Sequence, residues 1–181
     1  AVLMEVSTGE IVYARNRDER LPMASTTKIM TALVAIENSA LSTPVTVNTG
    51  AVGVEGSSVY LVPGEVLTME DLLYSLMLES ANDAAAAIAY AIGGSIEGFA
   101  EMMNGKAISL GLSDTHYTNP HGLDDPAHYT TAADLARLTA YALHNPDFAR
   151  IVSTYRHTIP MQDGDGVRVL VNHNRLLKQC A

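Results

Sequence analysis

Positive charge and long hydrophobic runs are both scarce in this sequence. Its 181 residues include 11 Lys and Arg against 20 Asp and Glu, which gives a net charge of −9 and a pI near 5.0. Nucleic-acid binding needs concentrated cationic charge against phosphate, so we expect no nucleic-acid partner. The longest uncharged apolar run, from Ala84 to Ile96, is too short to span a bilayer.

Cysteine and clustered metal ligands are scarce as well. The single cysteine, Cys180, excludes an internal disulfide, and we expect it to act as a small hydrophobic residue and not as a nucleophile. The histidines are scattered, and we interpret His121 as a residue that orders a loop or lines the edge of a cleft. Asp163 and Asp165 suit a turn as well as they suit calcium. The pattern therefore predicts no metal site and no cofactor.

The remaining composition is that of a folded domain. The hydrophobic content of 48% and the charged content of 17% exclude a disordered chain. We expect one domain over residues 1–181, with strands, then many helices, then strands, which is an α+β order. The predicted elements are a hairpin over 1–16, a helix from Ser25 to about Asn38, extended pieces over 44–48 and 59–67, helices over 68–78, 82–93, 95–110, 131–145 and 147–152, and a hairpin over 155–171.

Ser25 and Lys28 form the first motif that can carry chemistry. They lie three residues apart at the start of a predicted helix, so both side chains share one face. A serine hydroxyl becomes a nucleophile when a neighbour takes its proton, and a lysine amine can do so once its pKa is lowered. A serine that caps the helix before a solvated lysine would give the same pattern. With only 12 serines and 3 lysines in the chain, a chance match is rare.

Ser80 and Asn82 form the second motif, in a predicted loop between two helices. Residues two apart do not share a helix face, so both side chains can reach one site only from a loop. A hydroxyl there can relay a proton, and an amide can bind a substrate carbonyl. Side chains that cap the adjoining helices would fit equally well, with Asn82 and Asp83 capping the alanine-rich helix. The residues alone leave both interpretations open.

Together these motifs resemble the penicillin-binding serine D-Ala-D-Ala carboxypeptidases, the low-molecular-mass penicillin-binding proteins of the peptidase S11 type. Ser-x-x-Lys followed by Ser-x-Asn belongs to the motif set known for penicillin-binding proteins and β-lactamases. Within the matching segment 119–123, His121 and Gly122 are further substrate-binding candidates. The similarity covers essentially the whole chain, through segments 23–33, 80–82, 119–123, 128–135 and 172–177.

The resemblance implies a β-lactamase/transpeptidase-like fold, with a helical subdomain and an antiparallel sheet. It implies that Ser25 attacks the carbonyl between the two terminal D-alanines of a peptidoglycan pentapeptide, and that Lys28 accepts the serine proton. Ser80 would relay a proton to the leaving D-alanine, and Asn82 would hold a peptide carbonyl of the substrate. β-Lactam antibiotics would acylate the same serine as covalent inhibitors.

The third motif of the family, Lys-Thr-Gly on a late strand, does not occur in the sequence. Lys106 and Lys178 are followed by Ala and Gln. In the family this motif binds the substrate carboxylate and supplies an oxyanion-hole amide, and losing one such donor costs about 10²–10³ in rate. We therefore expect residues 1–181 to be an incomplete serine D,D-peptidase domain that lacks the C-terminal strands of its sheet and is nearly inactive alone.

Two other functions fit parts of the pattern. A class A β-lactamase shares the first motif, but that family reads Ser-Asp-Asn where this chain has Ser80-Ala81-Asn82. No Glu-x-x-Leu-Asn segment follows to position a deacylating water. A non-catalytic penicillin-sensing domain would keep the Ser-x-x-Lys pair, and the sequence does not separate it from an enzyme.

The ends of the chain and its location give further expectations. The sequence opens as a strand already under way, so we expect a trimmed protein or a fragment that continues beyond Ala181. We also expect the hairpin over 1–16 to lack sheet partners and to expose its apolar face. The resemblance implies an exported protein at the outer face of the cytoplasmic membrane, in the periplasm or in the cell wall. Any membrane contact would come through segments that this chain does not include.

Overall fold

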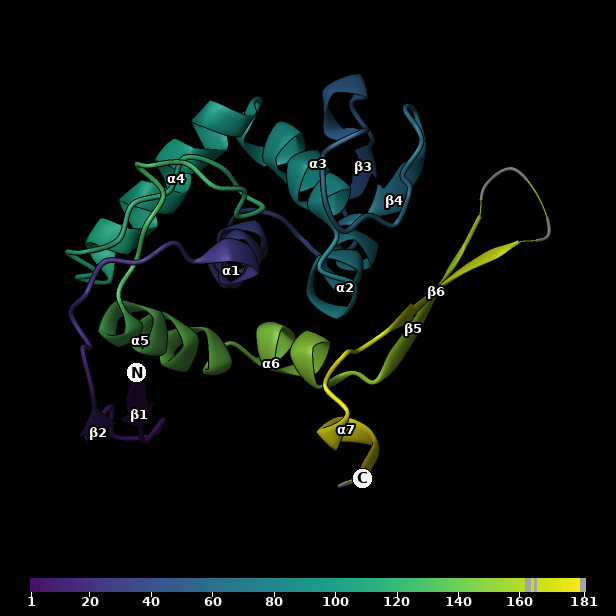
Figure 1. Ribbon diagram of the computed structural model, residues 1–181. Helices are drawn as coiled ribbons and strands as arrows, with labels where there is room; N and C mark the ends of the chain where they lie inside the picture. The colour runs from purple at the N-terminus through teal and green to yellow at the C-terminus, as the bar shows by residue number, and fades with distance from the viewer. Residues whose placement is uncertain (162–163, 165, 180–181) are drawn as a thin grey trace.

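Helix α1 (Lys28–Asn38) is the central element of the computed structural model, which describes residues 1–161, 164 and 166–179. Most of its residues are buried, and a helix that is apolar on nearly every side belongs inside a core. The helices that pack around it are α2 (Met69–Leu78), α3 (Asn82–Gly93), α4 (Ile96–Ser109), α5 (Ala132–Leu143) and α6 (Pro146–Ser153) (Figure 1).

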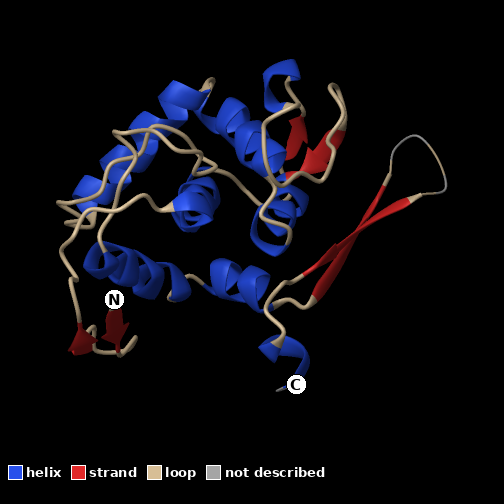
Figure 2. Cartoon of the chain, viewed as in Figure 1, coloured by secondary structure: helices blue, strands red, loops and turns tan. Residues whose placement is uncertain are grey.

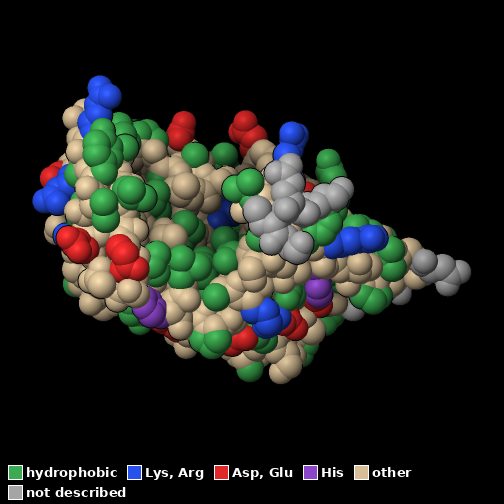
Figure 3. Space-filling view, turned by 90° about the horizontal axis from the view of Figure 1, so that it is seen from below, with side chains coloured by type: hydrophobic (Ala, Val, Ile, Leu, Met, Phe, Trp, Pro, Cys, Tyr) green, Lys and Arg blue, Asp and Glu red, His purple; other side chains and the backbone are tan. Residues whose placement is uncertain are grey.

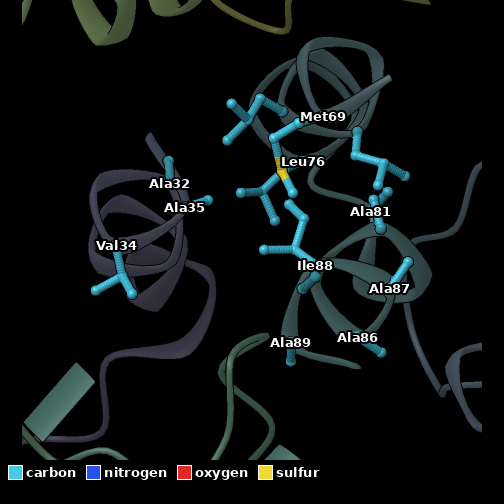
Figure 4. Close-up of a cluster of buried hydrophobic side chains, with 14 of the residues drawn as sticks. Ala32, Val34, Ala35, Met69, Leu76, Ala81, Ala86, Ala87, Ile88 and Ala89 are labelled. Atoms are coloured by element: carbon cyan, nitrogen blue, oxygen red, sulfur yellow. The ribbon is translucent and has the colours of Figure 1, made fainter. Parts of the chain in front are cut away.

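Small side chains let α3 approach its neighbours closely. Figure 4 shows Ala35 of α1 pointing toward Leu76 of α2 and Ile88 of α3. All three of these side chains are almost completely buried. Alanine loses no side-chain entropy in a helix and leaves room for a partner helix, so the alanine-rich α3 suits this position.

Local capping signals set most helix boundaries, as the sequence predicts. Thr68 and Asp71 form a complete capping box at the start of α2. Ser95 accepts from the backbone N–H of Gly98 at 3.0 Å and begins α4. Thr131 accepts from the N–H of Asp134 at 3.1 Å and begins α5.

The start of α3 contradicts the predicted cap. Its N-cap residue is Ala81, which makes no side-chain capping bond. The amide of Asn82 instead donates to the carbonyl of Glu55 at 2.6 Å. The interpretation of Asn82 as a helix cap is therefore wrong, because a non-local carbonyl takes its side-chain donor.

The strands form small antiparallel sheets, so the fold is α+β as predicted (Figure 2). Within the described ranges the strands pair two by two, and the hairpins predicted over 1–16 and 155–171 are confirmed. The pairs are β1 (Val2–Met4) with β2 (Ile11–Ala14), β3 (Pro44–Thr46) with β4 (Val66–Thr68), and β5 (Arg156–Pro160) with β6 (Val167–Val171). Short helical turns complete the chain: η1 (Ala24–Thr27), η2 (Thr49–Ala51) and α7 (Leu176–Gln179).

One predicted extended segment is shorter in the structure than the sequence predicted. The piece predicted over 59–67 is a strand only from Val66 onward, because Gly64 turns the chain at a φ of +82° and segment 58–61 bonds to α3. The predicted turn residues Asp163 and Asp165 lie outside the described residues, and so does Cys180.

The first hairpin exposes apolar side chains, as predicted from its lack of sheet partners. Leu3 is 58% exposed, Val12 65% and Tyr13 56%. An apolar groove separates β1 from α5, lined by residues such as Met4 and Leu143. Figure 3, which views the molecule from below, shows hydrophobic side chains in several groups on that face. No helix in the described part of the chain is long and apolar enough to cross a bilayer.

Substituting alanine for each of two helical glycines should change the stability of the protein in opposite directions. A Cβ on Gly93, at the end of α3, would lie 2.4 Å from the backbone nitrogen of Phe99 in α4. We expect Gly93→Ala to push the two helices apart and to lower the free energy of unfolding by about 1–3 kcal/mol. Gly105 in α4 has open space around its Cα, so Gly105→Ala should raise that free energy by about 0.5–1 kcal/mol. Urea unfolding measures both, and changes of the same sign would contradict the packing described.

Candidate active site

The entry to α1 brings Ser25 and Lys28 together, as the motif predicts. Lys28 Nζ lies 3.1 Å from Ser25 Oγ and donates to the backbone carbonyl of His121 at 2.7 Å. Lys28 is only 2% exposed, whereas Ser25 is exposed. The N-caps of η1 and α1 are Met23 and Thr27, so Ser25 caps neither helix. The alternative of a capping serine before a solvated lysine is therefore wrong.

Burial changes the acid–base properties of Lys28. Desolvation disfavours the charged amine and lowers the pKa of Lys28 from 10.5 to about 8. About one molecule in ten then carries a neutral Lys28 at pH 7. The His121 carbonyl accepts one N–H of the amine, which leaves the lone pair of the neutral form free for another partner. At 3.1 Å, that partner can be the proton of the Ser25 hydroxyl.

The turn that carries Ser25 is strained and closely packed. Ala24 has a φ of +44°, in the left-handed region that side chains rarely adopt. Gly122 has a φ of +90°, and a Cβ there would lie 1.9 Å from the carbonyl oxygen of Ala24. The same atom would lie 2.9 Å from Thr27 Oγ1. The sequence suggested Gly122 as a substrate-binding candidate, and in the structure its backbone packs directly behind the serine turn.

Asn119 orders the loop that carries the His121 carbonyl. Its Oδ1 accepts from the backbone N–H groups of Gly122 at 2.7 Å and His121 at 3.3 Å. Its Nδ2 donates to the carbonyl of Leu123 at 2.9 Å. The His121 ring accepts from the N–H of Leu123 at 3.3 Å, which suits a loop-ordering residue. Burial and the nearby Lys28 lower the pKa of His121 to about 4, so its ring is neutral at pH 7.

His128 forms a second link between this loop and α1, and the sequence analysis missed it. Its Nε2 lies 2.7 Å from Thr27 Oγ1, and its Nδ1 accepts from the N–H of Thr118 at 3.0 Å. The second contact assigns the proton to Nε2, which therefore donates to Thr27. Burial lowers the pKa of His128 and favours this neutral form. No local signal predicted the bond, because 101 residues separate the two partners.

The second motif spans the α2–α3 loop and the start of α3: Ser80 lies in the loop, as predicted, whereas Asn82 is the first residue of α3. Ser80 is half-buried with a φ of +56°, again in the left-handed region. Asn82 is buried, and its backbone N–H donates to the carbonyl of Ser57 at 2.7 Å. Among the described residues no hydrogen bond joins either side chain to the Ser25–Lys28 pair. The packing of α1 against α3 links the two motifs. Over the same residues, no group of three or more potential ligand side chains is arranged to hold a metal ion.

The sequence and the structure are both similar to known carboxypeptidases. Residues 1–181 match the peptidase S11 family, described as D-alanyl-D-alanine carboxypeptidase. The chain is 38% identical over 183 residues to D-alanyl-D-alanine carboxypeptidase DacF of Bacillus subtilis, a match that covers 98% of the chain and 47% of DacF. It is 34% identical to D-alanyl-D-alanine carboxypeptidase DacB2 of Mycobacterium tuberculosis, covering 98% of the chain and 61% of DacB2.

Solved structures agree in fold. The crystal structure of D-alanyl-D-alanine carboxypeptidase from Mycobacterium tuberculosis matches with a TM-score of 0.92 and 33% identity, over 98% of this chain and 67% of that one. The Streptomyces K15 DD-transpeptidase matches with a TM-score of 0.88 and 33% identity, over 97% of this chain and 73% of that one.

These matches, together with the Ser25–Lys28 geometry, define the class of protein. The chain belongs to the S11 family of serine D-alanyl-D-alanine carboxypeptidases, and the predicted family and transpeptidase-like fold are confirmed. It spans about half the length of the curated relatives it matches, with 47% of one and 61% of another covered.

Gly122→Ala tests how closely the loop packs on the serine turn. Gly64→Ala is the matched control, because Gly64 has a similar φ of +82° but open space around it. Both variants pay the cost of a left-handed alanine, about 1–2 kcal/mol. Only Gly122→Ala also overlaps the Ala24 carbonyl, which should cost about 1–3 kcal/mol more. Thermal unfolding should show a clearly larger fall in Tm for Gly122→Ala, and equal falls would contradict the contact.

Proposed function

We propose that the protein containing this chain removes the terminal D-alanine from peptidoglycan stem peptides ending in D-Ala-D-Ala, through an ester on Ser25. The observation that carries the proposal is an exposed serine hydroxyl 3.1 Å from a buried lysine amine, in a chain of the S11 family. No Lys-Thr-Gly triplet occurs in residues 1–181. We therefore propose the activity for the protein as its cell makes it, and not for these residues in isolation.

Acylation begins with the neutral form of Lys28. The amine takes the proton of the Ser25 hydroxyl, and Oγ bonds to the carbonyl carbon of the penultimate D-alanine. The C–N bond to the terminal D-alanine then breaks, and its nitrogen receives a proton relayed by the Ser80 hydroxyl. The products of this step are free D-alanine and an ester on Ser25. Because the His121 ring is neutral, it does not lower the pKa of Lys28 any further.

Asn82 holds the substrate through the part of its amide that the fold leaves available. One N–H of Nδ2 goes to the Glu55 carbonyl at 2.6 Å, and this bond determines which end of the amide is the donor. The second N–H of the same nitrogen can donate to a peptide carbonyl of the stem peptide. An amide donor suits a neutral carbonyl acceptor, because it brings no charge that must be desolvated.

Deacylation returns the serine. A water molecule adds to the ester carbonyl, the bond to Ser25 Oγ breaks, and Oγ regains a proton as the shortened peptide leaves as a carboxylic acid. A β-lactam reacts at the same serine, but opening its ring releases no separate leaving group, so the drug stays attached as an ester. Because the stem peptide lies outside the cytoplasmic membrane, we propose an exported protein.

Labelling with a tagged penicillin, followed by peptide mapping, tests the nucleophile. We expect label on Ser25, loss of label in Ser25→Ala and slower labelling in Lys28→Ala, because the serine proton then has no acceptor. Ser95→Ala is the matched control, since Ser95 is a capping serine at the start of another helix and should not affect labelling. Label on a residue other than Ser25, or no label at all, would refute the proposal.

A second assay separates the proposed activity from its alternatives. The protein should release D-alanine from a D-Ala-D-Ala peptide. Labelling without D-alanine release would favour a penicillin-sensing domain. Steady-state hydrolysis of a β-lactam faster than a few turnovers per second would favour a β-lactamase.

A further inference from the structure

Asp83 anchors a distant loop to the start of α3. Its carboxylate is buried, at 2% exposure, and accepts four hydrogen bonds. Oδ2 accepts from Ser58 Oγ at 2.6 Å and from the N–H of Leu61 at 3.0 Å. Oδ1 accepts from the N–H groups of Val59 at 3.2 Å and Ala84 at 2.9 Å. Only the bond from Ala84 is local to α3, and the other three bonds join Asp83 to the loop that contains Ser58, Val59 and Leu61.

The same loop also bonds to Asn82, through residues that precede the segment 58–61 bonded to Asp83. The carbonyl of Glu55 accepts from Asn82 Nδ2 at 2.6 Å, and the carbonyl of Ser57 accepts from Asn82 N at 2.7 Å. Between them Gly56, with a φ of +97°, leaves so little room that a Cβ would lie 2.7 Å from Asn82 Nδ2. The amide of Asn82 is therefore packed directly on this backbone.

The far side of the loop is anchored as well. Arg168 of β6 donates to the carbonyl of Val59 at 2.8 Å and pairs with Glu65 at 2.9 Å, with both charged side chains only 10% exposed. Between these anchors Tyr60 has a φ of +57°, a strained conformation for an aromatic residue. Such strain persists only where the surroundings over-determine the backbone. Segment 55–65 is thus held in one conformation from both sides.

We infer that Asp83 is a positioning residue for substrate recognition by Asn82. It fixes segment 58–61, which holds the Glu55 carbonyl in place, and that carbonyl keeps the Asn82 amide turned so that its second N–H is available to the acyl carbonyl of a substrate. If the amide flipped, its oxygen would meet the Glu55 oxygen with no proton between them. The inference rests on the proposed function, and Asp83 itself touches no substrate.

Two penicillins that share one nucleus and differ in the acyl side chain separate this role from a general loss of structure. Benzylpenicillin carries an acylamino side chain whose carbonyl Asn82 can bind. In 6-aminopenicillanic acid a free amine replaces that group, so there is no such carbonyl. The measurement is the second-order rate constant for acylation of Ser25 by each compound, in the protein as its cell makes it, expressed as the ratio of the first to the second.

Asp83→Asn should lower this ratio about tenfold, because an amide nitrogen then faces donor groups and the loop loses its anchor. Asn82→Ala should lower the ratio by a similar factor. Adding Asp83→Asn to Asn82→Ala should lower it no further, because both act through one hydrogen bond. Gly56→Ala should also lower the ratio, by displacing Asn82 Nδ2 directly.

Asp134→Asn is the matched control. Asp134 is also buried in the first turn of a helix, at 3% exposure, and accepts from the N–H of Asp114 at 3.0 Å and from Thr115 Oγ1 at 2.9 Å. Its substitution should leave the ratio unchanged. If Asp83→Asn does not fold, Ser58→Ala, which removes one donor to the same carboxylate, and Gly56→Ala decide the question in its place.

The inference is overturned if Asp83→Asn slows both compounds equally, if it slows neither, or if Asn82→Ala leaves the ratio unchanged. Failure of the proposed function looks different. It would appear as label on a residue other than Ser25, or as no label with either compound in the unsubstituted protein.

Discussion

The burial of one amine, Lys28 Nζ, is the constraint on which the rest of the site depends. A buried cation is costly unless it is paired or loses its charge, and no carboxylate is among its described hydrogen-bond partners. Its partners are a serine hydroxyl and a backbone carbonyl, both uncharged, so burial lowers the pKa of Lys28 to about 8. A neutral amine beside an exposed hydroxyl is then available near physiological pH, as the proposed acylation requires.

The two motifs of the site are held by two loops that come from distant parts of the chain. The loop that contains Asn119 supplies the His121 carbonyl and packs Gly122 behind the serine turn. The loop that contains Glu55 fixes the amide of Asn82. Ser25 follows a left-handed residue, Ala24, and Ser80 is itself left-handed. Such strain persists where the surrounding structure supports it, and the close packing of Gly122 on Ala24 gives that support at the first motif.

The sequence predicted what local signals determine. Capping residues such as Thr68 and Ser95, together with the hairpins at both ends, follow from interactions within a few residues and are confirmed. It did not predict contacts between distant segments. A helix cap stayed open as one interpretation of Asn82, because a short-range pattern cannot reveal that the Glu55 carbonyl takes its donor. The bond from His128 to Thr27 was missed for the same reason.

The most direct test of the central claim is the acylation rate of Ser25 by benzylpenicillin as a function of pH, beside a titration of the Lys28 amine by competitive labelling. Deprotonation creates the active base, so the account predicts that the rate rises through pH about 8 and then levels off, following the titration of Lys28. Lys106, whose pKa is raised by its bonds to Glu37 and Tyr141, should titrate well above it. A rate that does not change between pH 6 and 9, or a Lys28 amine that titrates together with Lys106, would contradict the account.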